Sequence, residues 1–127
     1  MIVGLGIDVA ELDRIERALA RHGERFLTKV LTGEEIRGLP ALARNRVSYV
    51  AARFAAKEAA SKALGTGFSG GITIKDFDVA SDQGGKPLIR FFRKAEDRAM
   101  QLGVTRAHLS ITHGRDVAAA VVVLEAP

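Results

Sequence analysis

Hydrophobic and polar residues alternate along the first segment of the chain, residues 2–9. One face of this segment carries four apolar side chains: Val3, Leu5, Ile7 and Val9. The other face begins at Ile2, contains Gly4 and Gly6, and ends at Asp8. A period of two predicts a β-strand. Because glycine has no side chain, this second face lets another backbone or a ligand come close, with the Asp8 carboxylate beside it.

A helical period follows over residues 11–22. Its apolar stripe consists of Leu12, Ile15 and Leu19. Gly23 comes directly after this segment and is expected to end the helix. On another face of the same helix, three basic residues repeat at the same spacing: Arg14, Arg17 and Arg21. Such a stripe is most often a solvated helix face, so it needs a second observation before it predicts a binding surface.

Shorter helices and one long helix are predicted next. Residues 25–31 are amphipathic, and Thr32 followed by Glu35 matches a capping box that begins a short helix. The longest helix is expected to run from near Ala41 or Asn45 to position 64, because its second half is dense in alanine. A glycine-rich turn, residues 65–71, closes it.

The second half of the chain has the pattern of antiparallel strands. Residues 72–79 and 88–92 predict two strands, and SDQGGKP between them is typical of a hairpin. Residues 93–102 have helical character, residues 107–112 alternate, and the continuous apolar run 117–124 predicts a central strand. This order favours an α+β fold, with a small, mostly antiparallel sheet packed against a long helix and shorter helices in one domain, 1–127.

Composition narrows the functional classes. Hydrophobic residues make up 47% of the chain and charged residues 27%, as in an ordinary globular protein. The net charge of +4 favours an anionic partner without identifying it. The absence of cysteine excludes thiolate chemistry and suits a cytoplasmic protein, which is the expected location. No apolar run reaches the length of a membrane span, so we expect no membrane partner.

The long helix carries the strongest chemical signal. Glu58 and Lys62 are four residues apart and share one stripe, next to a polar side with Arg53, Lys57 and Ser61. Alone, such a pair is an ordinary surface ion pair that stabilises by about 0.2–0.5 kcal/mol. Its opposite side is lined by alanines and is expected to be buried. With the carboxylate at the end of the first strand, however, Glu58 supplies the few oxygen ligands that Mg²⁺ prefers beside phosphates and water, and Lys62 could neutralise such a phosphate.

Four segments together resemble a known family: GIDVAELDRI, RFLTKVLTGEEI, FAAKEAASKALGTG and HLSITHGRDVAAAVVVLE. They are similar to the short bacterial holo-acyl-carrier-protein synthases, which are 4′-phosphopantetheinyl transferases, and the match covers essentially the whole chain in order. Phe54 stands where the family often has tryptophan, and it keeps an aromatic wall. Ala10 stands where larger members of the superfamily have another carboxylate, which fits the short class.

The resemblance implies a fold and a reaction. The fold is that of the 4′-phosphopantetheinyl transferases. A serine hydroxyl of apo acyl carrier protein attacks the β-phosphate of coenzyme A, the 4′-phosphopantetheine arm is transferred, and 3′,5′-ADP leaves, as a step of fatty acid biosynthesis. Asp8 and Glu58 are then expected to hold Mg²⁺, and the catalytic residues are Asp8, Glu58 and Lys62. The base for the serine proton is either Glu58 or a metal-bound water near Asp8.

The resemblance also implies binding partners and the residues that contact them. Coenzyme A is expected to contact nine residues: Arg53, Lys62, Gly65, Gly67, Lys86, Pro87, His108, Ser110 and Thr112. Because acyl carrier proteins are acidic, the basic stripe is expected to dock one beside the metal site: Arg14, Arg17 and Arg21. The family further implies a homotrimer with sites between subunits.

Two other readings compete with this one. A small nucleic-acid-binding domain would explain the basic charge, but aromatic residues make up only 6%, tryptophan is missing, and no RNP-like pattern is present. We therefore expect no nucleic acid partner. A non-catalytic nucleotide-binding or assembly domain is the other alternative. Coenzyme A with Mg²⁺ should stabilise the protein against heat if the transferase reading is right, whereas oligonucleotides should not.

Overall fold

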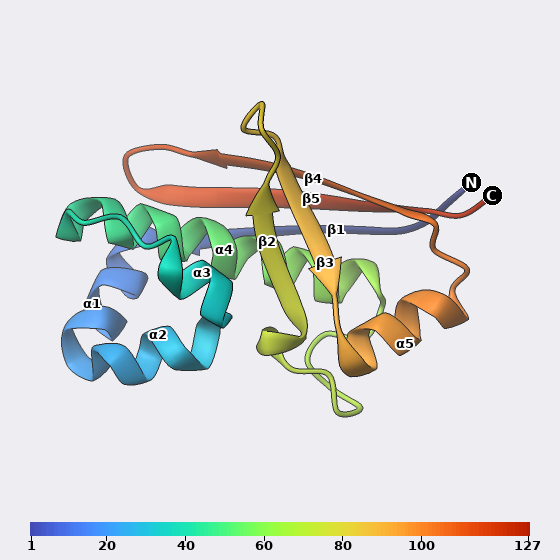
Figure 1. The fold of residues 1–127 in the computed structure, drawn as a ribbon, viewed down its shortest axis with the longest axis horizontal. Helices are drawn as coiled ribbons and strands as arrows, with labels where there is room; N and C mark the ends of the chain where they lie inside the picture. The colour runs from blue at the N-terminus through green and yellow to red at the C-terminus, as the bar shows by residue number, and fades with distance from the viewer.

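The computed structural model describes residues 1–127 and contains two antiparallel sheets and five α-helices (Figure 1). The elements in chain order are β1 Ile2–Glu11, α1 Leu12–His22, α2 Glu24–Val30, α3 Gly33–Arg37, α4 Ala43–Ala63, a 3₁₀ turn Ile74–Asp76, β2 Phe77–Ser81, β3 Pro87–Phe91, α5 Arg93–Gln101, β4 Arg106–His113 and β5 Val117–Glu125. The α+β class and the long central helix expected from the sequence are confirmed.

The larger sheet has the strand order β1-β5-β4, and both pairs are antiparallel. The predicted central position of the apolar strand is therefore confirmed. Alternate residues of β5 are buried on the face that contacts α4: Ala118, Ala120, Val122 and Leu124. Asp8 of β1 pairs with Ala120, so its side chain lies on this same inner face.

Helix α4 lies along the inner face of the larger sheet (Figure 1). Its backbone comes so close to β1 that a Cβ at Gly6 would be 1.9 Å from the carbonyl oxygen of Ala59. A Cβ at Gly4 would be 2.1 Å from the carbonyl oxygen of Ala63. The predicted close approach is thus confirmed, and the approaching group is the helix itself. The helix meets the core through small side chains that are all buried: Ala51, Ala52, Ala55, Ala56, Ala59, Ala60 and Ala63.

The apolar face of β1 has no cover within the chain. Leu5, Ile7 and Val9 are 65%, 64% and 57% exposed. By the register they lie beside Val123, Val121 and Ala119 of β5, which are only half-buried. The outer face of the larger sheet is therefore an exposed apolar surface, which is unusual for a free monomer.

The polar side of α4 differs from the prediction. Lys57 and Ser61 are fully buried, although the helical pattern grouped them with Arg53 on a polar side of the helix. The reason is that α2, α3 and β2 cover this part of the helix. Of the four charged residues expected to crowd this surface, three keep access to solvent: Arg53, Glu58 and Lys62.

The smaller sheet is the predicted hairpin of β2 and β3. Its first strand starts later than expected from the run 72–79, because Thr73 and Asp76 form a capping box around a 3₁₀ turn. Arg93 Nε donates to Asp76 Oδ1 at 2.7 Å and holds this turn against the start of α5. The capping box at Thr32 and Glu35 that begins α3 is present as predicted.

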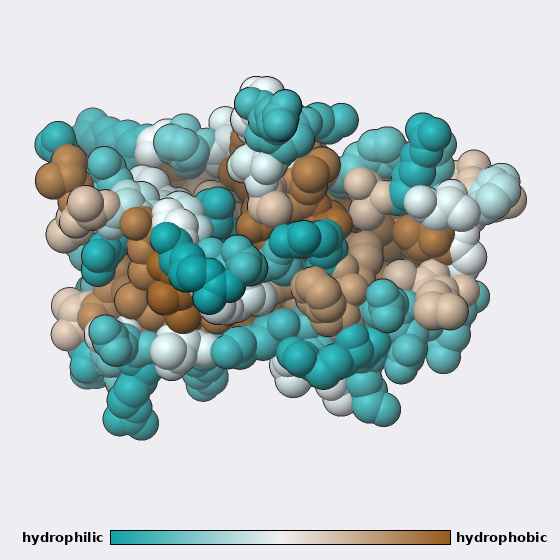
Figure 2. All heavy atoms as spheres, in the orientation of Figure 1, coloured by the Kyte–Doolittle hydropathy of each residue, from teal (hydrophilic) through white to brown (hydrophobic).

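Apolar residues reach the surface in a groove between α1, α2 and the first turns of α4 (Figure 2). Leu19, Leu27 and Val47 line it, and charged residues form its rim. None of the helices combines the length and the apolar character that a membrane span requires.

Candidate functional site

The structure brings the three predicted catalytic residues together. Lys62 Nζ, near the end of α4, donates to Asp8 Oδ1 at 2.9 Å and to the carbonyl oxygen of Ile7 at 3.2 Å. The Asp8 side chain is mostly shielded from solvent, whereas that of Lys62 is half exposed. The glycine-lined face of β1 makes this contact feasible, because it lets α4 lie close enough for a helical side chain to reach the strand.

Glu58 is electrostatically coupled to this ion pair. Partial burial raises the pKa of Glu58, the nearby charge of Asp8 raises it further, and Lys62 opposes both effects. The hydrogen bond to Asp8, together with its charge, raises the pKa of Lys62. The site therefore contains two carboxylates that repel one another and one ammonium group that is shared between them.

These carboxylates fit a hard divalent cation. Asp8 and Glu58 offer only oxygen ligands, and a bound cation would relieve the repulsion that raises the Glu58 pKa. No group of three or more His, Cys, Asp or Glu side chains that could hold a metal is present. A two-carboxylate set suits Mg²⁺, which keeps several waters and takes phosphate oxygens as further ligands, and it does not suit zinc, which prefers nitrogen and sulfur.

The glycine-rich turn begins where α4 ends. Gly65 and Gly67 have φ angles of 79° and 60°, which side-chain-bearing residues rarely adopt. The N–H of Gly65 donates to the carbonyl oxygen of Lys62, and the N–H of Gly67 donates to that of Ser61. These bonds fix the turn directly after the predicted phosphate-binding lysine.

A cavity of about 490 Å³ lies between α4, the β2–β3 hairpin and β4. The guanidinium carbon of Arg53 lies 3.5 Å from the centroid of the Tyr49 ring, and Arg53 Nε is buried without a hydrogen-bond partner. Arg53 forms no ion pair with a carboxylate of the chain. A cation held over an aromatic ring at a cavity wall, without a carboxylate partner, is suited to bind an anion. Pro87 also lines this cavity, and Lys86 precedes it on the exposed hairpin.

The prediction missed His113, which lines the same cavity as Arg53. The alternating segment predicted from the sequence ended at position 112, and the structure places its apolar residues Leu109 and Ile111 opposite Val122 and Ala120 on the inner face. In the structure β4 continues to His113, so the alternation places His113 on the same inward face. Extending the predicted strand by one residue would have identified it.

His108, Ser110 and Thr112 are not where a single-chain site requires them. They lie opposite Val123, Val121 and Ala119 on the exposed outer face of the larger sheet, whereas Arg53 and Asp8 belong to the inner side. His108 Nε2 is 2.8 Å from Glu125 Oε1. Within one chain these residues and Arg53 are therefore on opposite faces of the larger sheet, and the prediction that they contact coenzyme A, which left the subunit of each contact open, stays a prediction.

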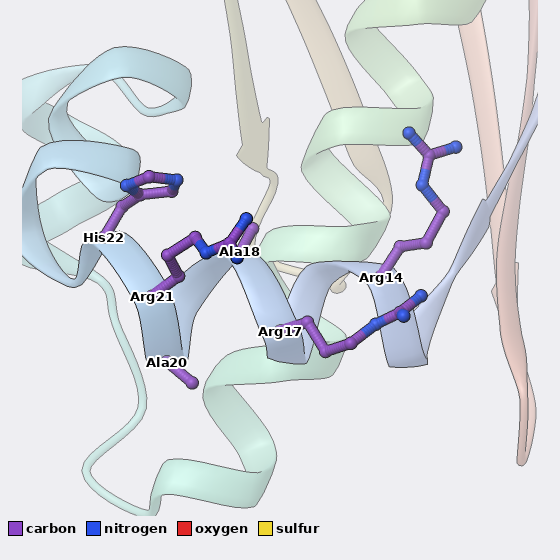
Figure 3. Close-up of a pocket in the computed structure, with 6 residues that line it drawn as sticks. All are labelled: Arg14, Arg17, Ala18, Ala20, Arg21 and His22. Atoms are coloured by element: carbon purple, nitrogen blue, oxygen red, sulfur yellow. The ribbon is translucent and has the colours of Figure 1, made fainter.

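The three arginines of the basic stripe extend from successive turns of α1 and line one shallow pocket with a volume of about 670 Å³ (Figure 3). Arg17 forms an exposed ion pair with Asp13 at 3.3 Å. Arg14 and Arg21 have no carboxylate partner within the chain, so their charges are available to an acidic partner. Helix α1 starts directly after β1, which places this surface close along the chain to Asp8.

Comparisons with known proteins identify the family of this chain. Residues 4–122 match the pattern of the 4′-phosphopantetheinyl transferase superfamily. The chain is 58% identical over 125 residues to the holo-[acyl-carrier-protein] synthase of Maridesulfovibrio salexigens, and the match covers 98% of this chain and 99% of the relative.

The solved structures similar to this chain include complexes with coenzyme A or its nucleotide part, of which two follow. The Bacillus anthracis holo-(acyl-carrier-protein) synthase in complex with CoA (3′,5′-ADP) is 40% identical, with a TM-score of 0.80 over 100% of this chain and 99% of that one. The Helicobacter pylori holo-[acyl-carrier-protein] synthase in complex with coenzyme A is 30% identical, with a TM-score of 0.81 over 95% of this chain and 99% of that one. The chain therefore belongs to the 4′-phosphopantetheinyl transferase superfamily.

Proposed function

We propose that this protein transfers 4′-phosphopantetheine from coenzyme A to a serine of apo acyl carrier protein, giving the holo carrier protein and 3′,5′-ADP. The observation that carries the proposal is the meeting of Asp8, Glu58 and Lys62 between β1 and the end of α4. The names of the full-length relatives and the coenzyme A complexes of two structural neighbours support the choice of substrates.

The reaction forms one bond and breaks one. The serine oxygen bonds to the β-phosphorus of coenzyme A, and the bond from that phosphorus to the bridging oxygen of the α-phosphate breaks. The serine proton passes to the Glu58 carboxylate, which lies beside Asp8 and Lys62 where the phosphates are expected to bind. Lys62 exchanges its contact with Asp8 for the pyrophosphate and balances the charge on the departing 3′,5′-ADP. When bound by Asp8 and Glu58, Mg²⁺ would stabilise the negative charge that develops on the phosphates.

The nucleotide end of coenzyme A is assigned to the cavity beside Arg53. Arg53 lines that cavity without a carboxylate partner, and His113 offers a ring nitrogen from another wall. Both groups suit the 3′-phosphate. Gly65 and Gly67 directly follow Lys62 at the end of α4, so in our proposal their backbone lies near the pyrophosphate and away from the nucleotide end.

The carrier protein is proposed to dock on α1. Arg14 and Arg21 present unpaired positive charges one and three turns after β1, so an acidic helix bound there would be close to the metal-binding carboxylates. Electrostatic attraction of this kind mainly increases the association rate and weakens with salt.

A homotrimer is proposed for the working enzyme. The exposed outer face at Leu5, Ile7 and Val9 supports an interface between copies of the chain, since covering it would remove apolar surface from water. Such an interface would bring His108 and its neighbours on β4 toward another subunit, where they could still reach a shared coenzyme A. A cytoplasmic location remains part of the proposal, supported by the lack of cysteine.

Two measurements separate this proposal from the alternatives. Coenzyme A with Mg²⁺ should raise the melting temperature, whereas an oligonucleotide of equal charge should not at moderate salt. Release of 3′,5′-ADP, measured by chromatography, should occur only when apo carrier protein is present. Stabilisation by coenzyme A without any release would favour the non-catalytic nucleotide-binding domain, and stabilisation by the oligonucleotide alone would favour the nucleic-acid-binding domain.

A further inference from the structure

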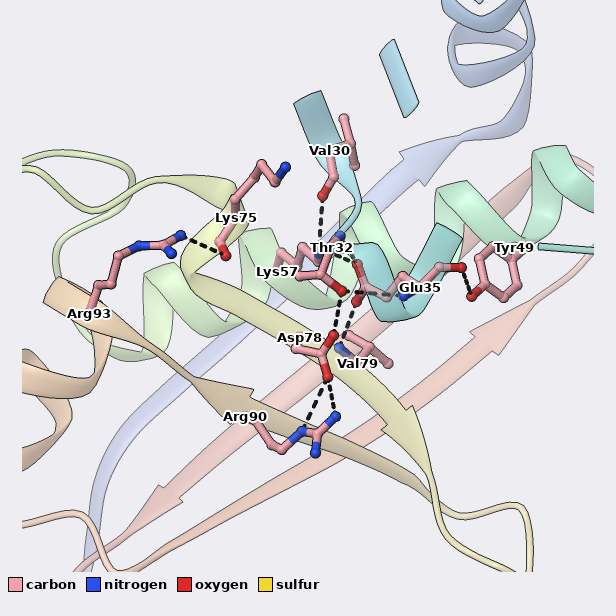
Figure 4. Close-up of polar contacts among 10 residues, drawn as sticks. All are labelled: Val30, Thr32, Glu35, Tyr49, Lys57, Lys75, Asp78, Val79, Arg90 and Arg93. Carbon is pink, nitrogen blue, oxygen red and sulfur yellow. Dashed lines mark hydrogen bonds and ion pairs between the residues drawn. The ribbon is translucent and has the colours of Figure 1, made fainter. Parts of the chain in front are cut away.

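A buried ion pair between Lys57 of α4 and Glu35 of α3 has no part in the proposed transfer reaction. Lys57 is 0% exposed. Its Nζ donates to Glu35 Oε1 at 2.6 Å and to the carbonyl oxygen of Val30 at 2.7 Å (Figure 4). Burial lowers the pKa of Lys57, and the attraction of Glu35 opposes that shift. Because desolvating two charges costs about as much as their attraction returns, stability alone does not explain such a pair.

Glu35 is the centre of the contacts in Figure 4. Its Oε1 also accepts from the N–H of Thr32 at 2.8 Å, and its Oε2 accepts from the N–H of Val79 at 2.6 Å. Its backbone carbonyl oxygen accepts from the Tyr49 hydroxyl. One residue of α3 therefore holds α4 at two points, Tyr49 and Lys57, and holds β2 at Val79.

The groups held by Glu35 are walls of the cavity assigned to the nucleotide. Tyr49 and Val79 both line that cavity, and the Tyr49 ring carries the guanidinium of Arg53. Next to Val79, Asp78 accepts from the Thr32 hydroxyl and from Arg90, which ties β2 to β3. The hairpin that supplies the opposite wall is thus fixed to the same point as the helix that supplies Arg53.

We propose that Glu35 and Lys57 are positioning residues that hold the walls of the nucleotide cavity at the spacing that binds coenzyme A. The inference rests on the proposed function, since it takes coenzyme A as the ligand. Neither residue lines the cavity; they act through Tyr49 and Val79 on Arg53. Because Asp8 keeps its direct contact with Lys62, loss of the pair weakens binding of coenzyme A more than it slows transfer at saturating coenzyme A.

The first test compares two neighbouring substitutions on α3. Glu35→Gln keeps the shape of the side chain but removes the charge that holds Lys57. Glu34→Gln is the matched control, because Glu34 is exposed and pairs only with Arg37. Glu35→Gln should raise the KM for coenzyme A and the Kd for 3′,5′-ADP by about tenfold, as expected for a less preorganised site. Its kcat should stay within about threefold of wild type, and the control should match wild type in all three.

A second variant separates positioning from stability. Lys57→Met combined with Glu35→Gln leaves no buried charge at this point, so it should recover thermal stability relative to Lys57→Met alone. We expect the folded double variant still to bind 3′,5′-ADP about tenfold more weakly than wild type. Wild-type affinity in a folded double variant would overturn the positioning role. If neither Glu35→Gln nor the double variant folds, the ion pair is needed for stability, and the positioning role is overturned as well.

Transfer by the wild-type protein, measured in parallel, distinguishes a failure of the proposed function from a failure of the positioning role. An inactive wild-type protein would overturn the proposed function. An active wild-type protein whose Glu35→Gln variant has an unchanged KM, or a lowered kcat with an unchanged KM, would overturn only the positioning role of Glu35 and Lys57.

Discussion

Substituting Gly6 by alanine should separate the two halves of the catalytic site. The new Cβ would lie 1.9 Å from the carbonyl oxygen of Ala59, where ordinary contacts begin at 3.4 Å. The backbone of β1 fixes the position of the Cβ, and the oxygen belongs to the backbone of α4, so neither atom can rotate away. Helix α4 would therefore have to move by roughly 1.5 Å from β1. Overpacking of this kind typically costs about 1–3 kcal/mol, and a clash with backbone belongs at the upper end. For a chain of this size we expect the melting temperature to fall by about 10 °C.

The same displacement should impair catalysis beyond its effect on stability. Asp8 lies two residues after Gly6 on β1, and its partners Glu58 and Lys62 lie on the helix that moves. A misplacement of about 1 Å at a reacting centre can lower the rate about 100-fold. Thermal unfolding and transfer to apo carrier protein, both well below the melting temperature, measure the two effects. Gly114→Ala is the control, because nothing lies within 4 Å of its added Cβ. Wild-type stability and activity for Gly6→Ala would refute the described packing of α4 on β1.

Three further predictions address individual residues. Arg14→Glu should raise the KM for carrier protein about tenfold or more at low salt and leave coenzyme A binding unchanged; equal loss of both would argue against docking on α1. Glu58→Gln should abolish transfer. It should also melt at a higher temperature than wild type at neutral pH, because the raised pKa shows that folding disfavours the ionised form of Glu58. The contribution of Glu58 to stability is fully present below the pKa of the unfolded carboxyl group and is lost as the pH rises through the folded pKa. In acid the two proteins should melt alike, and a lower melting temperature at neutral pH would contradict this. His113→Ala should raise the KM for coenzyme A about tenfold and more than His108→Ala does; the reverse order would return the nucleotide site to the outer face.

The proximity of the three proposed catalytic residues was predictable because the strand pattern and the helix pattern each placed them on the faces that meet. The alternation of β1 put Gly4, Gly6 and Asp8 on one face, and the helical period put Glu58 and Lys62 on one stripe. Each rule works within a single element, and the structure needed only to pack the two elements together. The family resemblance then supplied the reaction, which no pattern of spacing gives.

The errors occurred where tertiary packing overrides local pattern. Lys57 has the spacing of a surface residue, but Glu35, 22 positions earlier, covers it. His113 was missed because the predicted strand ended one residue before it, and because the sequence does not give the face of the sheet that α4 covers. Neither fact is local in the sequence. The exposed apolar face of β1 shows the same limit, since the alternation gives the face but not what covers it.

The proposed reaction attaches part of coenzyme A to a carrier protein. The most direct measurement is the intact mass of apo acyl carrier protein after incubation with the protein, coenzyme A and Mg²⁺, followed by peptide mapping of the modified residue. We expect the carrier mass to increase by one 4′-phosphopantetheine group on one serine, and to stay unchanged with Glu58→Gln or without Mg²⁺. An unchanged carrier mass with the wild-type protein, under conditions in which coenzyme A is bound, would overturn the proposed function.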